Sequence, residues 1–357
     1  MKKFFSLFVM AAVVLGMAGC GQNEPEAGIQ ITVQQTVGRV RIIASVANQQ
    51  VYFYSGCAGK QALEESGGIQ KHLENIFKGY DFDYAKKVDS ICQGTKDYIV
   101  APKKEYVAYI AVVEKGEKGE IQLTGRIVTK EFTTIQALPG EFSVSTTKKV
   151  HFAKSNYIKT DKGFSIENSQ WYYLSANGPT GTHDLHAWND IPQDFENGYY
   201  VPSAEEWWYL FKKRPRADEL FAHATVENVH GLILLPDNWQ TPEGISLKTS
   251  KEMGMVWDNA KYEYAAEKDY DGYAPNIYKE DEWMDLEFAG AVFLPAADPA
   301  GISSNLSGWY WSSTEFDQNT VYALSFGKDN LTLSRLRENP LPKTNSNAVR
   351  LVVRAVE

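Results

Sequence analysis

The segment from Gly290 to Thr314, GAVFLPAADPAGISSNLSGWYWSST, most constrains how this chain can fold. It opens with a short apolar run that ends at Pro295, the pattern of a buried strand followed by a strand breaker. After a loop rich in glycine, proline and serine, Trp309, Tyr310 and Trp311 follow one another. Successive side chains of a strand point to opposite faces, so the three rings cannot share one side. We predict that the two tryptophans point inward and that Tyr310 points outward, on a face suited to binding.

The first twenty residues, MKKFFSLFVMAAVVLGMAGC, predict export. Two lysines precede an apolar run that is shorter than a membrane span of about 20 apolar residues, as in a secretory signal peptide. The end of the segment resembles a lipobox, which implies removal of residues 1–19 and lipidation of Cys20. Similarity to Gram-negative lipoproteins implies the outer membrane, facing either the periplasm or the cell surface. An ordinary signal peptide, with Cys20 incidental, is the alternative. Residues 20–27 would form a lipidated polar tether.

Charge and cysteine content narrow the classes of partner. The whole chain carries a formal charge of −9, which becomes more negative when Lys2 and Lys3 leave with the signal peptide. An acidic exported protein without a basic cluster is a poor candidate for binding nucleic acid. Cys57 and Cys92 remain besides Cys20, in a compartment that permits disulfides. They form either one disulfide or two free thiols.

Residues 28–136 predict an all-β sandwich with a helical insertion. The segments IQITV from residue 29 and RVRIIASV from residue 39 have the period of strands. Between residues 61 and 80 apolar side chains have near-helical spacing, and Gly67-Gly68 predicts a break there. The order of the later segments resembles a fibronectin-type-III-like sandwich of Bacteroidota surface lipoproteins. This resemblance implies a corner tyrosine, Tyr106 or Tyr109, and the role of a spacer.

Residues 139–357 predict an α+β domain. The segment YYVPSAEEWWYLF contains a capping box, since Ser203 is a helix N-cap and Glu206 lies three residues later. GLILLPDNW from residue 231 has the pattern of a buried strand. Together with Gln170-Trp171, GAVFLPAA, GWYWSST and the terminal AVRLVV, these motifs resemble the Fibrobacter succinogenes major paralogous-type domain. That resemblance implies a C-type-lectin-like fold, which formylglycine-generating enzymes also adopt.

The sequence argues against an enzyme. Formylglycine chemistry needs a pair of cysteines in this domain, and no cysteine follows Cys92. The motifs GxSxG, HExxH and the phosphate-binding loop are also missing from the sequence. His183, Asp184 and His186 could bind a metal or transfer protons, but we interpret them as loop residues. We therefore expect no catalytic residues.

Two segments resemble parts of calcium sites. Trp188-Asn189-Asp190 spells the calcium triplet of sugar-binding lectins, but it precedes the Ser203 helix, whereas the lectin triplet lies near the C-terminus. Asp269-Tyr270-Asp271-Gly272 is a fragment of a calcium loop that lacks the downstream glutamate. We expect no metal and no cofactor, and the sequence does not support a calcium site.

We expect the ligand site on the C-terminal part of the second domain. An outward Tyr310 and the polar loop after it would form an aromatic surface with a rim. In retroelement-diversified proteins of similar fold the binding residues lie on this part, which is an analogy. The candidate ligand-binding residues are Tyr310, Glu315, Asp317, Gln318 and Asn319.

The sequence thus predicts a membrane-anchored envelope lipoprotein whose C-type-lectin-like head binds a glycan or protein ligand. This adhesin-like role is non-catalytic. A structural or assembly component of a surface appendage or envelope complex is the alternative. A degenerate enzyme of the formylglycine-like fold is a third reading, against which the missing cysteines weigh.

Overall fold

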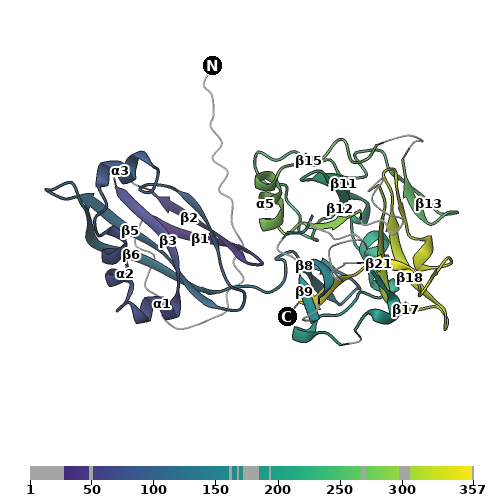
Figure 1. Cartoon of the computed structure of the whole chain (residues 1–357). Helices are drawn as coiled ribbons and strands as arrows, with labels where there is room; N and C mark the ends of the chain where they lie inside the picture. Colours follow the sequence, from purple (N-terminus) through teal and green to yellow (C-terminus); the bar gives the residue numbers. More distant parts are fainter. Residues whose placement is uncertain are drawn as a thin grey trace, which may run out of the picture.

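The chain is described here from a computed structural model, which places residues 28–47, 51–160, 163–166, 169–171, 185–192, 194–266, 271–296 and 306–355. The fold is mostly β, with several sheets. Figure 1 shows an N-terminal unit, which contains β1–β6 and α1–α3, and a C-terminal unit, which contains the later elements. No helix among the described residues is both long enough and apolar enough to cross a membrane.

The N-terminal unit is built from two antiparallel sheets of three strands each. The first runs in the order β1 (Ile29–Thr36), β2 (Arg39–Val46) and β4 (Thr95–Ile99). The second runs in the order β3 (Tyr52–Gly59), β5 (Glu105–Lys115) and β6 (Ile121–Thr133). Ile29 and Ala44 of the first sheet pack against Phe53, Ile110 and Val112 of the second. The two sheets therefore enclose a core between them.

Three helices connect β3 to β4: α1 (Lys60–Glu65), α2 (Ile69–Phe77) and α3 (Phe82–Lys87). The predicted break is confirmed, because Gly67 (φ 87°) and Gly68 (φ 98°) separate α1 from α2 in a backbone region that favours glycine. Leu73 and Phe77 of α2 pack against Tyr109 of β5. The helical insertion thus buries its apolar side against the second sheet.

Both cysteines of the N-terminal unit carry free thiols. Cys57 is half-buried on β3, and burial raises the pKa of its thiol to about 12. Cys92 is exposed in the segment before β4. Of the two alternatives that the sequence left open, the structure contains the pair of free thiols and no disulfide between them.

Three sheets form the C-terminal unit, as far as the chain is described. The largest runs in the order β10 (Leu185–Ala187), β21 (Ser346–Ala348), β17 (Gly308–Glu315), β18 (Thr320–Phe326), β19 (Asn330–Thr332), β14 (Glu263–Ala265) and β13 (Val256–Asp258), with β20 (Leu341–Pro342) also paired to β18. The second runs in the order β15 (Ile277–Tyr278), β11 (Phe221–Val226), β12 (Val229–Leu234) and β16 (Val292–Pro295). The third runs in the order β22 (Arg350–Arg354), β8 (Lys149–Thr160) and β7 (Phe142–Ser143), with β9 (Gly163–Ile166) paired to β8.

Helical segments flank these sheets. α4 (Ala204–Trp208) continues as a π-helical turn, η3 (Tyr209–Lys213), and α5 (Glu280–Phe288) precedes β16. The predicted capping box is confirmed: Ser203 Oγ accepts the Glu206 N–H at 3.2 Å, and Glu206 Oε2 accepts the Ser203 N–H at 2.8 Å. The short 3-10 turns are η1 (Trp188–Asp190), η2 (Glu196–Gly198), η4 (Ala217–Glu219) and η5 (Ser334–Leu336).

A buried arginine joins the beginning and the end of the C-terminal unit. Strand β22 pairs with β8, and its first residue, Arg350, is fully buried. The guanidinium donates to Asn156 Oδ1 at 3.0 Å and to the carbonyl oxygens of Lys154 and Phe293 at 3.1 and 2.6 Å. A buried charge is tolerated only when it is hydrogen-bonded, so Arg350 fixes β8, β16 and β22 relative to one another.

His223 is a titratable group in the middle of β11. It is fully buried, and its Nε2 lies 3.2 Å from the carbonyl oxygen of Asn330. Burial lowers the pKa of its imidazole to about 4, which the hydrogen bond to Asn330 only partly opposes. The folded protein therefore holds this side chain neutral, with Nε2 donating to the carbonyl.

The neutral His223 predicts acid sensitivity. Between pH 6.5 and about 4 the unfolded chain binds a proton that the folded chain excludes, so the free energy of unfolding should fall as the pH drops, by up to about 3 kcal/mol. His223→Gln, which keeps a side-chain donor, should remove this part of the pH dependence. Urea unfolding at neutral and mildly acidic pH measures it. An equal loss of stability in both proteins would contradict the assignment.

Candidate functional site

The prediction that Tyr310 points outward is wrong. Tyr310 is fully buried, its hydroxyl donates to the Pro295 carbonyl oxygen at 2.8 Å, and its ring stacks on Phe326. Trp311 is fully buried on the opposite face of β17, in a second core. The strand lies between two cores, so both of its faces are covered. Of the three consecutive aromatics only Trp309 is half-buried.

The other predicted residues, 315–319, form the exposed turn between β17 and β18. Asp317 Oδ1 accepts three hydrogen bonds of 2.8 Å, from the backbone N–H groups of Asn319 and Thr320 and from the Thr320 hydroxyl. The carboxylate of Glu315 lies 2.9 Å from Lys343 Nζ. Both acidic groups are therefore engaged in holding the turn and its neighbouring segment in place, although the turn remains accessible.

Tyr310 should behave as a core residue. Tyr310→Phe leaves the Pro295 carbonyl oxygen without its donor, so the free energy of unfolding should fall by about 1–3 kcal/mol. Tyr322→Phe is the matched control, because the hydrogen bond of its hydroxyl within the described residues is a long one, 3.5 Å to the Arg337 carbonyl oxygen, and the loss should be smaller. Denaturant unfolding measures both. A Tyr310→Phe protein of unchanged stability that no longer binds ligand would restore Tyr310 as a binding residue.

The remaining predicted groups do not assemble into a metal site in the described part of the chain. No group of three or more His, Cys, Asp or Glu side chains in that part could hold a metal ion. His186 and Trp188 are buried and bond to the carbonyl oxygens of Tyr157 and Ser312, at 3.1 and 3.0 Å. The Asp271 carboxylate accepts a backbone N–H at 3.1 Å. Of the residues and segments singled out in the sequence, residues 1–27 with Cys20, as well as His183, Asp184, Asp269 and Tyr270, lie outside the described ranges.

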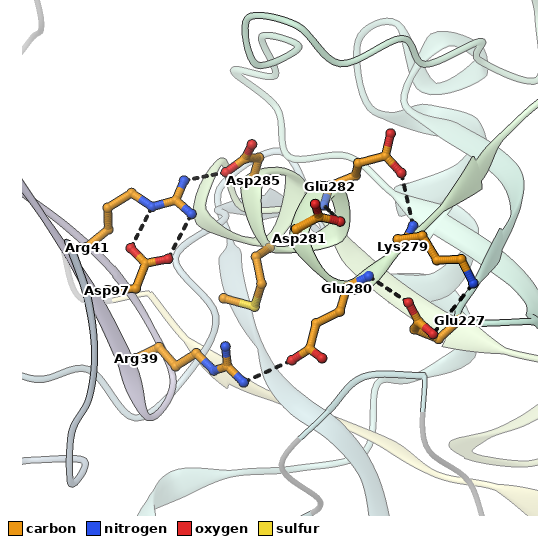
Figure 2. A pocket seen from close by; sticks show the side chains of 10 residues that line it. Arg39, Arg41, Asp97, Glu227, Lys279, Glu280, Asp281, Glu282 and Asp285 are labelled. Carbon is orange, nitrogen blue, oxygen red and sulfur yellow. Dashed lines mark hydrogen bonds and ion pairs between the residues drawn. The ribbon is translucent and has the colours of Figure 1, made fainter. Parts of the chain in front are cut away.

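A charged cleft of about 590 Å³ lies between the two units. Figure 2 shows Arg39 and Arg41 of β2 facing acidic side chains of α5. Arg41 forms ion pairs with Asp97 of β4, at 2.8 Å, and with Asp285 of α5. Arg39 pairs with Glu280 of α5 at 3.1 Å. The two arginines thus connect the units through charges that already have partners.

Buried polar contacts continue this junction. Thr36 Oγ1 donates to Glu287 Oε1 at 2.6 Å, and the other oxygen of this buried carboxylate accepts Gln170 Nε2 at 2.9 Å. Lys154 Nζ donates to the Val37 carbonyl oxygen at 2.7 Å. The β1–β2 hairpin therefore docks its turn onto the C-terminal unit. Because polar groups on both sides are paired, we interpret the cleft as a structural junction.

Arg41 should contribute most to this junction, since it joins two carboxylates and lies 4.5 Å over the Phe288 ring. Arg41→Ala should cost about 1–3 kcal/mol of unfolding free energy and speed hydrogen exchange in α5. Arg39→Ala breaks an exposed pair and should cost less than about 1 kcal/mol. Hydrogen exchange followed by mass spectrometry checks both variants. Unchanged exchange in α5 of the Arg41→Ala protein would contradict a role in holding the units together.

A second pocket, of about 540 Å³, lies on the C-terminal unit. We call it the Trp257 pocket. It is formed where the end of η3 and the turn of η4 approach β13 and β14, at one edge of the largest sheet. Its lining includes charged and aromatic side chains, among them Lys212, Arg216, Asp218, Lys251, Trp257 and Tyr264.

Trp257 supplies an aromatic surface in this pocket. Its indole N–H donates to Asn259 Oδ1 at 2.7 Å. The rings of Tyr264 and Trp208 meet it edge-on, with centroids 5.0 and 5.9 Å away. Lys212 Nζ lies 4.1 Å from the centre of the indole ring. The half-buried ring is therefore held in one orientation by its neighbours, with a cation over it.

The charges that line the pocket are only partly compensated. Arg216 and Lys251 share the carboxylate of Glu219, at 2.8 and 2.9 Å. Asp218 lies 3.2 Å from Lys251. Lys212 forms no ion pair with any residue that the structure describes. One ammonium group thus lies over the aromatic ring, and no carboxylate of the described residues pairs with it.

The Trp257 pocket is not among the sites predicted from the sequence. Trp257 lies in a segment without clear periodicity, and its strand, β13, has only three residues. A signal was present in the run KKRPR from residue 212, which places four basic residues in five positions of an acidic chain. The prediction of a chain without a basic cluster is therefore wrong at this run. Comparisons with protein-family models, with curated proteins and with solved structures found no match to this chain.

Proposed function

We propose that the chain is a membrane-anchored envelope lipoprotein whose C-terminal domain binds a glycan in the Trp257 pocket without catalysis. In this proposal Cys20 carries the lipid, and residues 20–27 tether the protein to the outer membrane. Residues 28–136 are a fibronectin-type-III-like spacer, and residues 139–357 are a C-type-lectin-like head. Neither nucleic acid nor a cofactor takes part.

Strand order supports the spacer fold. The sheets β1-β2-β4 and β3-β5-β6 divide the strands in the same way as the ABE and CFG strands of immunoglobulin-like sandwiches. Tyr106, at the start of β5, accepts the backbone N–H of Ala101 on its hydroxyl at 3.1 Å, as a corner tyrosine would. In the C-terminal unit, the pairing of β8 with β22 and the capped helix α4 are consistent with the family resemblance of the motifs.

The single observation that carries the binding function is the concave Trp257 pocket, with a fixed indole ring and polar groups around it. Its volume of about 540 Å³ lies within the range of roughly 300–1,000 Å³ for small-ligand sites. Flat aromatic faces stack on sugar rings, and surrounding polar groups bond to their substituents. A pocket of this size fits one or two sugar units better than it fits the surface of a protein partner.

The lining of the pocket favours binding over hydrolysis. Hydrolysis of a glycoside uses two carboxyl groups placed on either side of the bond. Among the lining residues Asp218 is the one carboxylate, and it is paired with Lys251 at 3.2 Å. Burial raises the pKa of Tyr264 to about 12, so its hydroxyl stays protonated. That hydroxyl is buried and donates to the Phe211 carbonyl oxygen at 3.1 Å, so the lining residues do not form an acid–base pair for hydrolysis.

Trp257→Ala should weaken glycan binding by about tenfold or more, because loss of the stacking surface removes at least about 1.4 kcal/mol. Trp309→Ala is the matched control: it is another half-buried tryptophan of the same sheet, with Arg335 5.0 Å over its ring. A glycan array followed by titration of the best ligand measures both. Equal losses in the two variants, or none in Trp257→Ala, would contradict the assignment of the pocket.

An assembly component is the second candidate, and strand β6 favours it. This strand of 13 residues pairs with β5 and has no partner on its other side among the described residues. Such an edge can accept a strand from another chain. Gly125, in the left-handed region at φ 84°, and the charged Lys130 and Glu131 interrupt the edge, and charges of this kind protect against pairing. Light scattering tests the second candidate: concentration-dependent oligomers would support assembly, and a monomer at all concentrations would contradict it.

A further inference from the structure

Lys212 is exceptional among the cations of the Trp257 pocket. The four cationic side chains in the lining are Lys212, Arg214, Arg216 and Lys251. Arg214 is buried and lies 3.3 Å from the carboxylate of Asp237. Arg216 and Lys251 both form ion pairs with Glu219. Lys212 alone among these four has no carboxylate within ion-pair distance in the described part of the chain.

We propose that the ligand of the Trp257 pocket is an anionic glycan, and that Lys212 binds its carboxylate or sulfate group. This inference rests on the proposed function of the pocket and adds the chemical class of the ligand. The ammonium lies 4.1 Å from the centre of the Trp257 ring and 5.6 Å from that of Tyr264. An acidic group of a sugar bound against the indole can therefore replace the ring as the partner of Lys212 Nζ.

The surroundings of Lys212 make an anion a better partner than a neutral sugar. Lys212 is half-buried, and this burial lowers the pKa of its ammonium group; the charge of Asp218 opposes the shift and that of Lys213 adds to it. Asp218 itself is engaged by Lys251. The contact of Lys212 with the indole ring is a weaker interaction than a charge-assisted hydrogen bond. An anionic group would thus replace a weak contact with a strong one.

The negative charge of the chain restricts how an acidic glycan can be bound. With a formal charge of −9 the protein repels anions at long range, so an acidic glycan must be held by local contacts. Ions of the solvent screen both this long-range repulsion and the local attraction to the ammonium, so the affinity for an acidic glycan should depend on salt. A ligand that is held only by stacking on Trp257 would show little response to salt.

The test compares acidic and neutral glycans on the protein from residue 21 onward. A glycan array containing both classes identifies binders, and isothermal titration then compares oligogalacturonate with its methyl ester, which has the same sugar without the charge. Lys212→Met removes the ammonium and keeps the alkyl stem. Lys213→Met is the control, because this neighbouring lysine is exposed and does not line the pocket. Circular dichroism confirms that both variants are folded.

We expect acidic glycans to bind, with an affinity about tenfold or more lower for Lys212→Met and unchanged for Lys213→Met. Where oligogalacturonate binds, its methyl ester should bind more weakly. The anionic class would be overturned if neutral glycans bound as tightly as acidic ones and Lys212→Met left the affinity unchanged. If Trp257→Ala still weakened binding, the proposed function of the pocket would stand. An array without any bound glycan would overturn both.

Discussion

The buried guanidinium of Arg350 is the interaction on which the C-terminal unit depends. Arg350 belongs to β22, and its guanidinium donates hydrogen bonds to backbone carbonyl oxygens of β8 and β16. It therefore joins elements that lie far apart in the sequence. A buried cation is costly unless its donors are used, so only one arrangement of these strands satisfies it. With β8, β16 and β22 fixed in this way, Tyr310 can donate to the end of β16, which attaches the largest sheet to this frame.

The largest sheet explains why the aromatic trio is structural and why the binding pocket lies elsewhere. In its middle, β17 has a core on each face, and Tyr310 and Trp311 fill one core each. At its edge, the short β13–β14 hairpin places Tyr264 in the same core as Tyr310, while Trp257 packs against this core and is only half-buried. The Trp257 ring at this edge keeps an accessible surface, which Tyr310 and Trp311 do not. The proposed glycan site therefore follows from where the sheet ends.

Local signals in the sequence predicted local structure well. The capping box at Ser203 and the break at Gly67-Gly68 depend on nearby residues alone, and both are present. Exposure of Tyr310 was predicted wrongly because strand alternation gives the face of a side chain but not whether that face is covered. Lys212 and Trp257 lie 45 positions apart and meet only through the pairing of β13, so periodicity could not bring them together. The basic run from residue 212 was the available clue.

The central claim is that the Trp257 pocket binds the ligand, and the indole N–H signals of the protein test it most directly. The chain contains 9 tryptophans, each with one such signal in a nitrogen–proton correlation spectrum. During titration with an acidic glycan that binds, the Trp257 signal should shift most, while those of Trp309 and Trp311 stay in place. Saturable binding that shifts the Trp309 signal and leaves Trp257 unchanged would contradict the claim.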